Sequence, residues 1–269
     1  MSEMPKLKDA LLDITDKVAT LTFNRDDVRN ALTGTNLIDD IIDTLDWVEH
    51  TSNAHVLVIT GAGKGFSSGG NVKDMHERTG MFSGNVEDIA AAYKATIQRI
   101  PLKMSQISFP VIAAINGAAV GAGFDLTAMC DIRIASTYAK FGENFVNIGL
   151  IPGDGGAYFL QRIVGYQRAS ELTFTGRLFE ADEAKEIGYV LDVVEPEELL
   201  VRAAELAAQI ASKPAYQVRQ SKLLMRKAQV MNLPDFLDLS ALVQGTCHHT
   251  EDHKEAVAAF VEKRSPNFN

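Results

Sequence analysis

Two glycine-rich segments, each following an apolar run, are the first candidates for chemistry. One is GAGKGFSSGGN at residues 61–71, after HVLVIT, and the other is NGAAVGAGFD at residues 116–125, after VIAAI. Turns rich in glycine allow the backbone to approach another group closely. Rigid N–H groups from two such turns can converge on one oxygen and stabilise charge that develops there during a reaction. The pair therefore predicts an oxyanion-binding site, with close backbone packing as the alternative.

The first segment also contains G-x-S-x-G at residues 65–69, a pattern typical of a nucleophilic serine at a strand-to-helix turn. This makes Ser67 a candidate hydrolase nucleophile. Four residues separate the apolar run from the pattern, however, and the histidines at 248, 249 and 253 belong to one polar cluster near the C-terminus. Nucleotide-binding patterns fail as well, because the phosphate-loop spacing is absent and Phe66 stands where a dinucleotide-binding segment has its third glycine.

Three acidic residues are candidates for proton transfer. They are Asp125 at the end of the second glycine-rich segment, Glu143 in FGENF and Asp154 in PGDGG. A carboxyl group in an apolar pocket has a raised pKa and can act as both acid and base. Each also has a structural alternative, because Asp125 can cap a helix, Glu143 can pair with Lys140 or Arg162, and Asp154 can be a turn residue.

The spacing of apolar residues predicts the elements that position these groups. Short β-branched or apolar runs predict strands at 18–23, 55–60, 111–115 and 132–135. Apolar residues with i, i+4 spacing predict a helix over 37–48, which Thr33 or Thr35 can cap. Further along, helical patterns prevail, at 181–187, 196–211, 214–230 and 251–263. The chain therefore predicts a mixed α/β core followed by a helical C-terminal part.

Composition narrows the range of partners. The 269 residues carry 26 Lys and Arg against 35 Asp and Glu, and this net charge of −9 disfavours nucleic acid and anionic membranes as partners. The apolar segment 111–130 lacks Lys and Arg, but Asp125 and three glycines favour a buried strand and helix over a membrane span. The N-terminus has no signal-peptide pattern, and Cys130 and Cys247 have no metal-ligand spacing. We expect a cytoplasmic protein without a metal.

Five ordered blocks resemble the crotonase (enoyl-CoA hydratase/isomerase) superfamily along nearly the whole chain. The blocks are Asn24-Arg25 with Asn30-Ala31-Leu32, GAGKGFSSGGN, INGAAVGAGFDLTAMCDIRIAS, FGENFVNIGLIPGDGG and AFVEKRSPNF. The resemblance implies a spiral of ββα turns over residues 1–195 and a helical trimerisation module over 196–269. It also implies a homotrimer or dimer of trimers that binds an acyl-CoA thioester and needs no cofactor beyond the CoA of its substrate.

The resemblance assigns roles to individual residues. The backbone N–H groups of Gly70 and Ala122 are expected to hold the thioester oxygen as an enolate forms. Backbone at residues 27–29 is expected to meet the adenine, and C-terminal positions often reach CoA from a neighbouring subunit. The implied substrate or CoA contacts are Asp27, Val28, Arg29, Lys64, Phe66, Ser68, Asn71, Phe260 and Lys263.

Hydratases of this superfamily use two carboxylates to hold one water. Asp125 occupies the first of these positions, but Phe145 occupies the second, so Glu143 or Asp154 is expected to substitute. Hydration of a 2-enoyl-CoA is the favoured activity, and double-bond isomerisation, which needs one carboxylate, is the second. A CoA-thioester-binding protein without chemistry and a serine hydrolase using Ser67 remain as alternatives of other classes.

Overall fold

A computed structural model describes residues 3–50 and 52–268, and its chain alternates between two sheets. The larger sheet has six strands in the order β1-β2-β3-β5-β7-β10, antiparallel between β1 and β2 and parallel elsewhere. Its strands are β1 (Ala10–Thr15), β2 (Val18–Phe23), β3 (Val56–Gly61), β5 (Val111–Ile115), β7 (Ile132–Ser136) and β10 (Asp192–Val194). The smaller sheet has the order β4-β6-β8-β9, with β4 (Gly65–Ser67), β6 (Ala118–Val120), β8 (Lys140–Gly142) and β9 (Phe179–Glu180).

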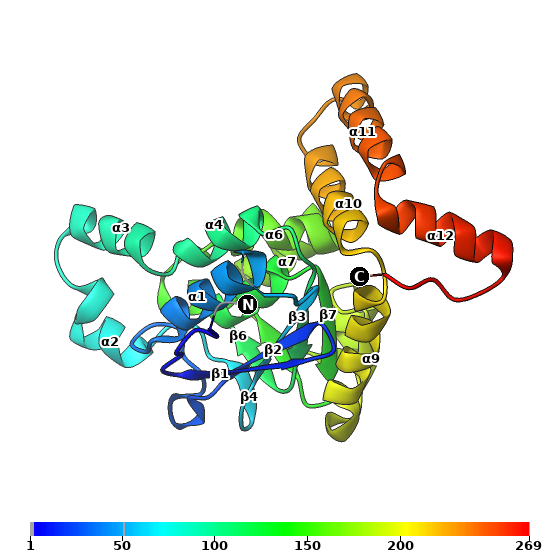
Figure 1. The fold of residues 1–269 in the computed structure, drawn as a ribbon. Helices are drawn as coiled ribbons and strands as arrows, with labels where there is room; N and C mark the ends of the chain where they lie inside the picture. The colour runs from blue at the N-terminus through cyan, green and yellow to red at the C-terminus, as the bar shows by residue number, and fades with distance from the viewer. Residues whose placement is uncertain (1–2, 51, 269) are drawn as a thin grey trace.

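Successive turns of the chain repeat one pattern. Each turn gives one strand to the large sheet and the next to the small sheet before a helix follows (Figure 1). The helices that close the turns are α2 (Val72–Glu77), α5 (Ala122–Met129) and α6 (Gly156–Val164). The predicted α/β architecture is confirmed, and both glycine-rich segments lie where a turn leaves one sheet for the other.

The large sheet is covered on both faces. Helices α1 (Leu37–His50), α4 (Arg99–Gln106) and α5 bury apolar residues in the main core on one side. Helix α9 (Leu199–Ala211) packs its i, i+4 residues against Val56, Val58 and neighbouring strand residues on the other side. Since α9 completes the core, the change in packing comes at Pro214, which precedes α10, and not at the expected boundary of residues 195 and 196.

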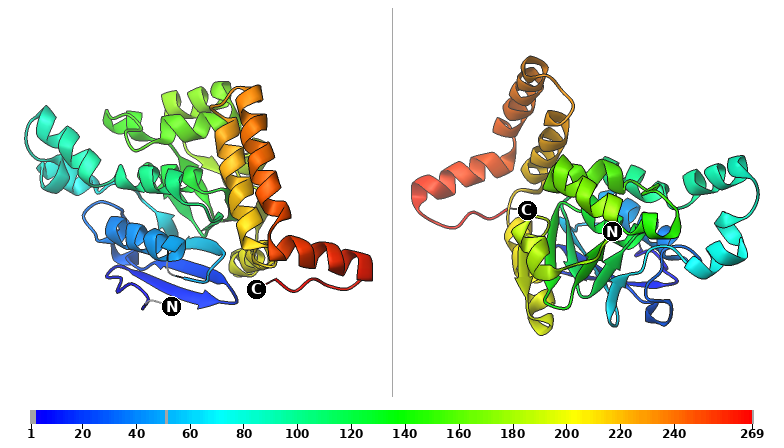
Figure 2. Two further views of the ribbon diagram at one scale, coloured as in Figure 1. Left: turned by 45° about the horizontal axis from the view of Figure 1, so that its top comes forward. Right: turned by 180° about the vertical axis from the view of Figure 1, so that it is seen from behind.

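Three helices project from this core, on the side opposite to α2 and α3 (Val86–Ala95) (Figures 1 and 2). They are α10 (Ala215–Ala228), α11 (Leu233–His248) and α12 (Glu251–Glu262). The buried Lys222 of α10 ties them to the core, because its Nζ donates to Asp131 Oδ2 and to the Phe109 carbonyl oxygen, both at 2.6 Å.

The remaining helices lie on the core, and they are α7 (Tyr166–Thr175) and α8 (Ala181–Glu186). The apolar segment at 111–130 forms β5, β6 and α5. Of the helices within residues 3–50 and 52–268, none is both long and apolar enough to cross a membrane.

Candidate active site

A cavity of about 440 Å³ opens where the glycine-rich segments meet α2, α3 and the segment after β8. Apolar side chains form most of its wall, and polar groups enter from a few positions. The lining residues are Val28, Arg29, Ala31, Thr33, Ser68, Gly70, Asn71, Val72, Lys73, Met75, Met81, Phe82, Tyr93, Ile97, Val120, Gly121, Ala122, Asn144, Phe145, Ile148, Leu150 and Asp154. A largely apolar cavity with a few convergent polar groups is the usual form of a small-molecule site.

The two glycine-rich segments press against each other beside this cavity. Gly69 has a φ of +75°, and a Cβ there would lie 2.6 Å from the Ala122 nitrogen. A Cβ at Gly123 would likewise lie 2.3 Å from the Ser67 carbonyl oxygen. Side chains at these positions would separate the segments, so glycine is required for the close approach. Backbone groups from both segments thereby reach one wall.

The N–H groups of Gly70 and Ala122 belong to that wall. Ala122 is the first residue of α5, where helix geometry provides no acceptor for an N–H group. Among the described residues, no hydrogen-bond acceptor within the chain is recorded for either N–H. Neither N–H group is therefore committed to a backbone bond that would exclude an oxyanion role.

Ser67 is occupied by structural hydrogen bonds. Its side chain is fully buried, its hydroxyl donates to the Asn30 carbonyl oxygen at 2.7 Å, and its Oγ accepts from the Gly69 N–H at 3.1 Å. Ser67 does not line the cavity, although the adjacent Ser68 does. A buried hydroxyl with both roles filled is not placed to attack a substrate, so the geometry opposes the hydrolase alternative.

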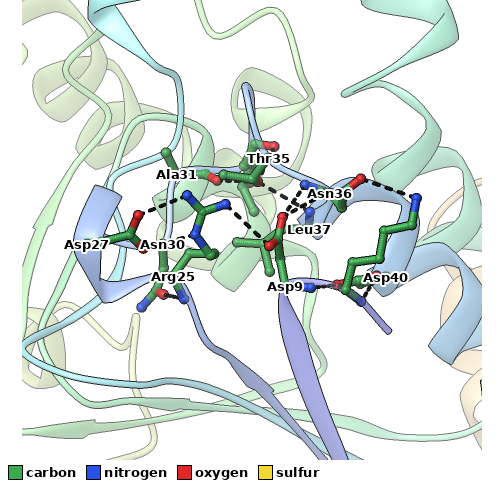
Figure 3. Close-up of polar contacts among 11 residues, drawn as sticks. Asp9, Arg25, Asp27, Asn30, Ala31, Thr35, Asn36, Leu37 and Asp40 are labelled. Carbon is green, nitrogen blue, oxygen red and sulfur yellow. Dashed lines mark hydrogen bonds and ion pairs between the residues drawn. The ribbon is translucent and has the colours of Figure 1, made fainter. Parts of the chain in front are cut away.

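Polar contacts fix the loop after β2, which forms the far wall (Figure 3). Asp9 accepts from Arg25 Nη1 at 3.2 Å and from the Asn36 backbone N–H at 2.6 Å. The Asn30 side chain accepts from the Arg25 N–H at 2.8 Å and donates to the carbonyl oxygens of Ala62 and Gly65, both at 3.0 Å. These bonds hold Asn30 at a φ of +52°, a strained conformation for a residue with a side chain.

Some of the expected CoA contacts in this loop line the cavity and others do not. Val28 and Arg29 line the cavity, whereas Asp27 does not, and its carboxylate accepts from Arg25 Nε and Nη2, both at 2.9 Å (Figure 3). Ser68 and Asn71 also line the cavity. The Asn71 side chain additionally caps α2 by accepting from Lys73 and Asp74 N–H groups.

Four other expected contacts lie outside the cavity wall of this chain. The Phe66 ring is fully buried and packs edge-on against Phe23, so its side chain is not available to a ligand. The Lys64 side chain is exposed beside the cavity-forming segment. Phe260, which is 86% exposed, and Lys263 lie at the end of α12, on the side opposite to α2 and α3 (Figure 2).

The three candidate acids form one buried cluster. Asp154 lines the cavity with 4% of its surface exposed, whereas Asp125 and Glu143 lie behind it and are fully enclosed. Asp125 Oδ2 accepts from the Gly156 N–H at 3.0 Å, and the Thr173 hydroxyl donates to Glu143 Oε2. A Cβ at Gly156 would clash with oxygens of both enclosed acids. The expected pairing of Glu143 with Lys140 or Arg162 does not occur.

Burial changes the acidity of the whole cluster. It raises the pKa of Asp125 well above its ordinary range, and the adjacent Asp154 and Glu143 raise it further. It also raises the pKa of Asp154, although hydrogen bonds from Asp125 and from its own backbone lower it. Burial raises the pKa of Glu143 to about 7 despite the Thr173 hydroxyl. Acids of this kind can hold or release a proton near neutral pH.

The sequence analysis missed the apolar wall that surrounds Asp154. Phe145 and Ile148 follow β8, and the rest of this wall comes from the stretch between α2 and α4, including Met81, Phe82 and Tyr93. Burial, and the charge of Asp154, raise the pKa of Tyr93, which remains a neutral phenol. Helical spacing over residues 86–97 was the one available signal, and it does not reveal which side faces a cavity.

Known proteins resemble this chain in sequence and fold. The sequence model of the enoyl-CoA hydratase/isomerase family matches residues 13–269. The crotonyl-CoA hydratase of Syntrophomonas wolfei is 36% identical over 97% of this chain and 98% of its own length. The short-chain-enoyl-CoA hydratase of Clostridium acetobutylicum is 36% identical over 96% and 97%. The crystal structure of an enoyl-CoA hydratase from Bacillus anthracis superposes with a TM-score of 0.90, at 34% identity, over 97% of this chain and 99% of that one.

Proposed function

Because the chain belongs to the enoyl-CoA hydratase/isomerase family, we propose that it is an enoyl-CoA hydratase, which adds water to a 2-enoyl-CoA thioester. One observation carries the proposal. The free N–H groups of Gly70 and Ala122 and the carboxyl group of Asp154 line the same apolar cavity. A site that stabilises an enolate oxygen and moves a proton needs both kinds of group.

In the proposed reaction, the two N–H groups hold the thioester oxygen. Water adds to the β-carbon, the electrons of the double bond move toward the thioester, and the enolate that forms is stabilised by these donors. A proton then adds to the α-carbon. Asp154 is the carboxyl group placed to activate the water and to return the proton, and CoA enters only as part of the substrate.

Isomerisation of an enoyl-CoA double bond is the second candidate, and a specific observation favours it. Of the described residues that line the cavity, Asp154 alone is acidic, and Phe145 occupies the wall where the resemblance expects a second acid. A single carboxyl group can carry a proton between the α- and γ-carbons. Hydration by the one acid that lines the cavity requires that the two enclosed acids support it.

The test measures both reactions with one enzyme preparation. Hydration of 2-butenoyl-CoA removes the absorbance of the conjugated thioester, whereas isomerisation of 3-hexenoyl-CoA creates it. Turnover of 2-butenoyl-CoA with formation of 3-hydroxybutanoyl-CoA supports the hydratase. Turnover of 3-hexenoyl-CoA alone supports the isomerase. Tight binding of both without turnover would support the alternative of a CoA-thioester-binding protein.

We also propose that the protein works as a homotrimer or a dimer of trimers held together by α10–α12. These helices expose apolar side chains that a lone chain would leave in water, including Met225, Leu242, Phe260 and Val261, each more than 70% exposed. Exposed apolar patches of this kind mark protein interfaces. An assembled partner would also bring its own Phe260 and Lys263 to a neighbouring cavity. Light scattering that finds a stable monomer at micromolar concentration would contradict this proposal.

A further inference from the structure

The contact between Asp125 and Asp154 requires a proton. The two side chains interact with each other, and Oδ1 of each is buried. Among the described residues, no N–H or O–H group donates to Oδ1 of either residue. Two ionised carboxylates cannot remain in contact inside a protein, because their charges repel and no water screens them. One of the two carboxyl groups must therefore be neutral and donate to the other.

The surroundings indicate which group holds the proton. Asp154 reaches the cavity and receives a hydrogen bond from its own backbone, so it can carry a negative charge. Asp125 is fully enclosed in α5, and its one recorded donor is the Gly156 N–H. Glu143 lies on the other side of Gly156 and further disfavours a charge on Asp125. The proton therefore belongs on Asp125.

From this geometry we propose that Asp125 is a positioning residue, whose neutral carboxyl group donates a hydrogen bond to Asp154 and orients it, while Asp154 alone exchanges a proton with the substrate. The inference rests on the proposed function for the role of Asp154. It departs from the expectation that Asp125 itself touches the substrate, because Asp125 contributes nothing to the cavity wall. The hydrogen bond keeps Asp154 ionised and ready to act as a base.

The pair faces a small set of titratable groups. Glu143 follows β8, Tyr93 belongs to α3, and Tyr189 follows α8 and contacts Thr127 of α5. Burial raises the pKa of both tyrosines, so they stay neutral where enzymes are assayed. Glu143, with a pKa of about 7, is the one neighbour that titrates there. Measurements at a pH well above this value, made with the Glu143→Gln variant, remove the titration of Glu143 from the observed pH dependence.

Asn is the matched replacement for a neutral carboxyl group that donates. In Asp125→Asn, the Gly156 N–H keeps the amide oxygen in place, so the amide NH₂ points toward Asp154. We expect kcat for 2-butenoyl-CoA to fall no more than about tenfold. Asp125→Leu has similar size but no donor, and kcat should fall on the order of 100-fold, with the acidic limb of the pH profile shifted to higher pH. Asp154→Asn should inactivate the enzyme. The inference is overturned if Asp125→Asn is as inactive as Asp154→Asn, or if Asp125→Leu matches Asp125→Asn in kcat and pH profile.

Infrared spectroscopy tests the proton directly and does not depend on turnover or on the folding of Asp125→Leu. At a pH well above the pKa of Glu143, the Glu143→Gln enzyme should show the carbonyl band of a neutral carboxyl group. This band should be absent from the double variant that carries both Glu143→Gln and Asp125→Asn. A spectrum without the band would overturn the inference. If the wild-type enzyme turns over neither 2-enoyl-CoA nor 3-enoyl-CoA, the proposed function fails, while the infrared result still decides where the proton lies.

Discussion

The Ser67 hydroxyl donates to the Asn30 carbonyl oxygen at 2.7 Å, and this bond joins the first glycine-rich segment to the loop after β2. The same oxygen accepts from the Gly69 N–H, so Ser67 fixes the turn that precedes Gly70. A residue that matches a nucleophile pattern in sequence is thus a structural cross-link in the folded chain.

Ser67→Ala should weaken the fold more than the reaction. Two buried backbone groups lose their partner, which costs about 1–3 kcal/mol in the free energy of unfolding. Hydration of 2-butenoyl-CoA should stay within about tenfold of wild type, because the hydroxyl does not reach the cavity. Denaturant unfolding and steady-state kinetics measure the two effects. Labelling of Ser67 by a fluorophosphonate, with complete loss of activity in the alanine variant, would restore the hydrolase alternative.

Ala122→Pro isolates one oxyanion donor. Proline removes the N–H group but fits the first position of a helix, which Ala122 occupies in α5. We expect kcat to fall on the order of 100-fold, the usual cost of losing one such donor. Ala122→Gly keeps the N–H and serves as the control, which should lose less than about tenfold. Equal kcat values for the two variants would remove Ala122 from the oxyanion site.

Glu143 predicts a pH dependence of stability. Its pKa of about 7 in the folded protein exceeds the ordinary value of 4.5, so the folded state binds more protons than the unfolded state between these values. Stability contributed by the neutral group is complete below the lower value and is lost as pH rises through about 7. Chemical denaturation of wild type and Glu143→Gln over this range should show a smaller loss in the variant. Parallel curves would contradict the raised pKa.

Thr173→Val tests the raised pKa of Glu143 by removing the hydroxyl that donates to the Glu143 carboxylate. The Thr173 hydroxyl lowers the pKa of Glu143, and valine removes it with little change in size. The pH at which stability is lost should therefore move upward in this variant. A downward shift would show that the hydroxyl does not act on the ionised carboxylate.

Phe260→Ala tests the contribution of a neighbouring subunit. Phe260 does not line the cavity of its own chain, so an effect on substrate binding would indicate a contact from another copy. We expect KM for 2-butenoyl-CoA to rise while kcat changes little, since contacts remote from the reacting atoms act on binding. Phe174→Ala, at another exposed ring, on α7, is the control. An unchanged KM in Phe260→Ala would exclude this contact.

Local patterns predicted many of the elements. The strands at 18–23 and 111–115 and the first helix follow from apolar spacing, and Thr35 accepts from the Leu37 N–H at 3.2 Å as a cap should. Helix α11 was not among the predicted elements, although Pro234 fits the first turn of a helix. The β1 strand was missed as well, because its exposed residues Asp13 and Thr15 interrupt the apolar run.

The sequence could not predict which of the three acids lines the cavity and which are enclosed, because this depends on packing between distant segments. The sequence identifies Asp125, Glu143 and Asp154 as candidates, but it does not show that Gly156 leaves the space beside Asp125 and Glu143 that a Cβ would fill. Likewise, the glycine-rich pattern does not reveal that Phe66 points into the core against Phe23. Side-chain direction in such turns is set by the tertiary contacts of both sheets.

The most direct test of the central claim is the hydration of 2-butenoyl-CoA by wild type and Asp154→Asn, measured beside the affinity of each for unreactive butanoyl-CoA. The account predicts turnover by wild type, a loss of at least about 100-fold in the variant, and affinities within about threefold, because the variant keeps the cavity and the oxyanion donors. Wild-type enzyme that binds butanoyl-CoA but forms no 3-hydroxybutanoyl-CoA, or Asp154→Asn that hydrates at the wild-type rate, would contradict it.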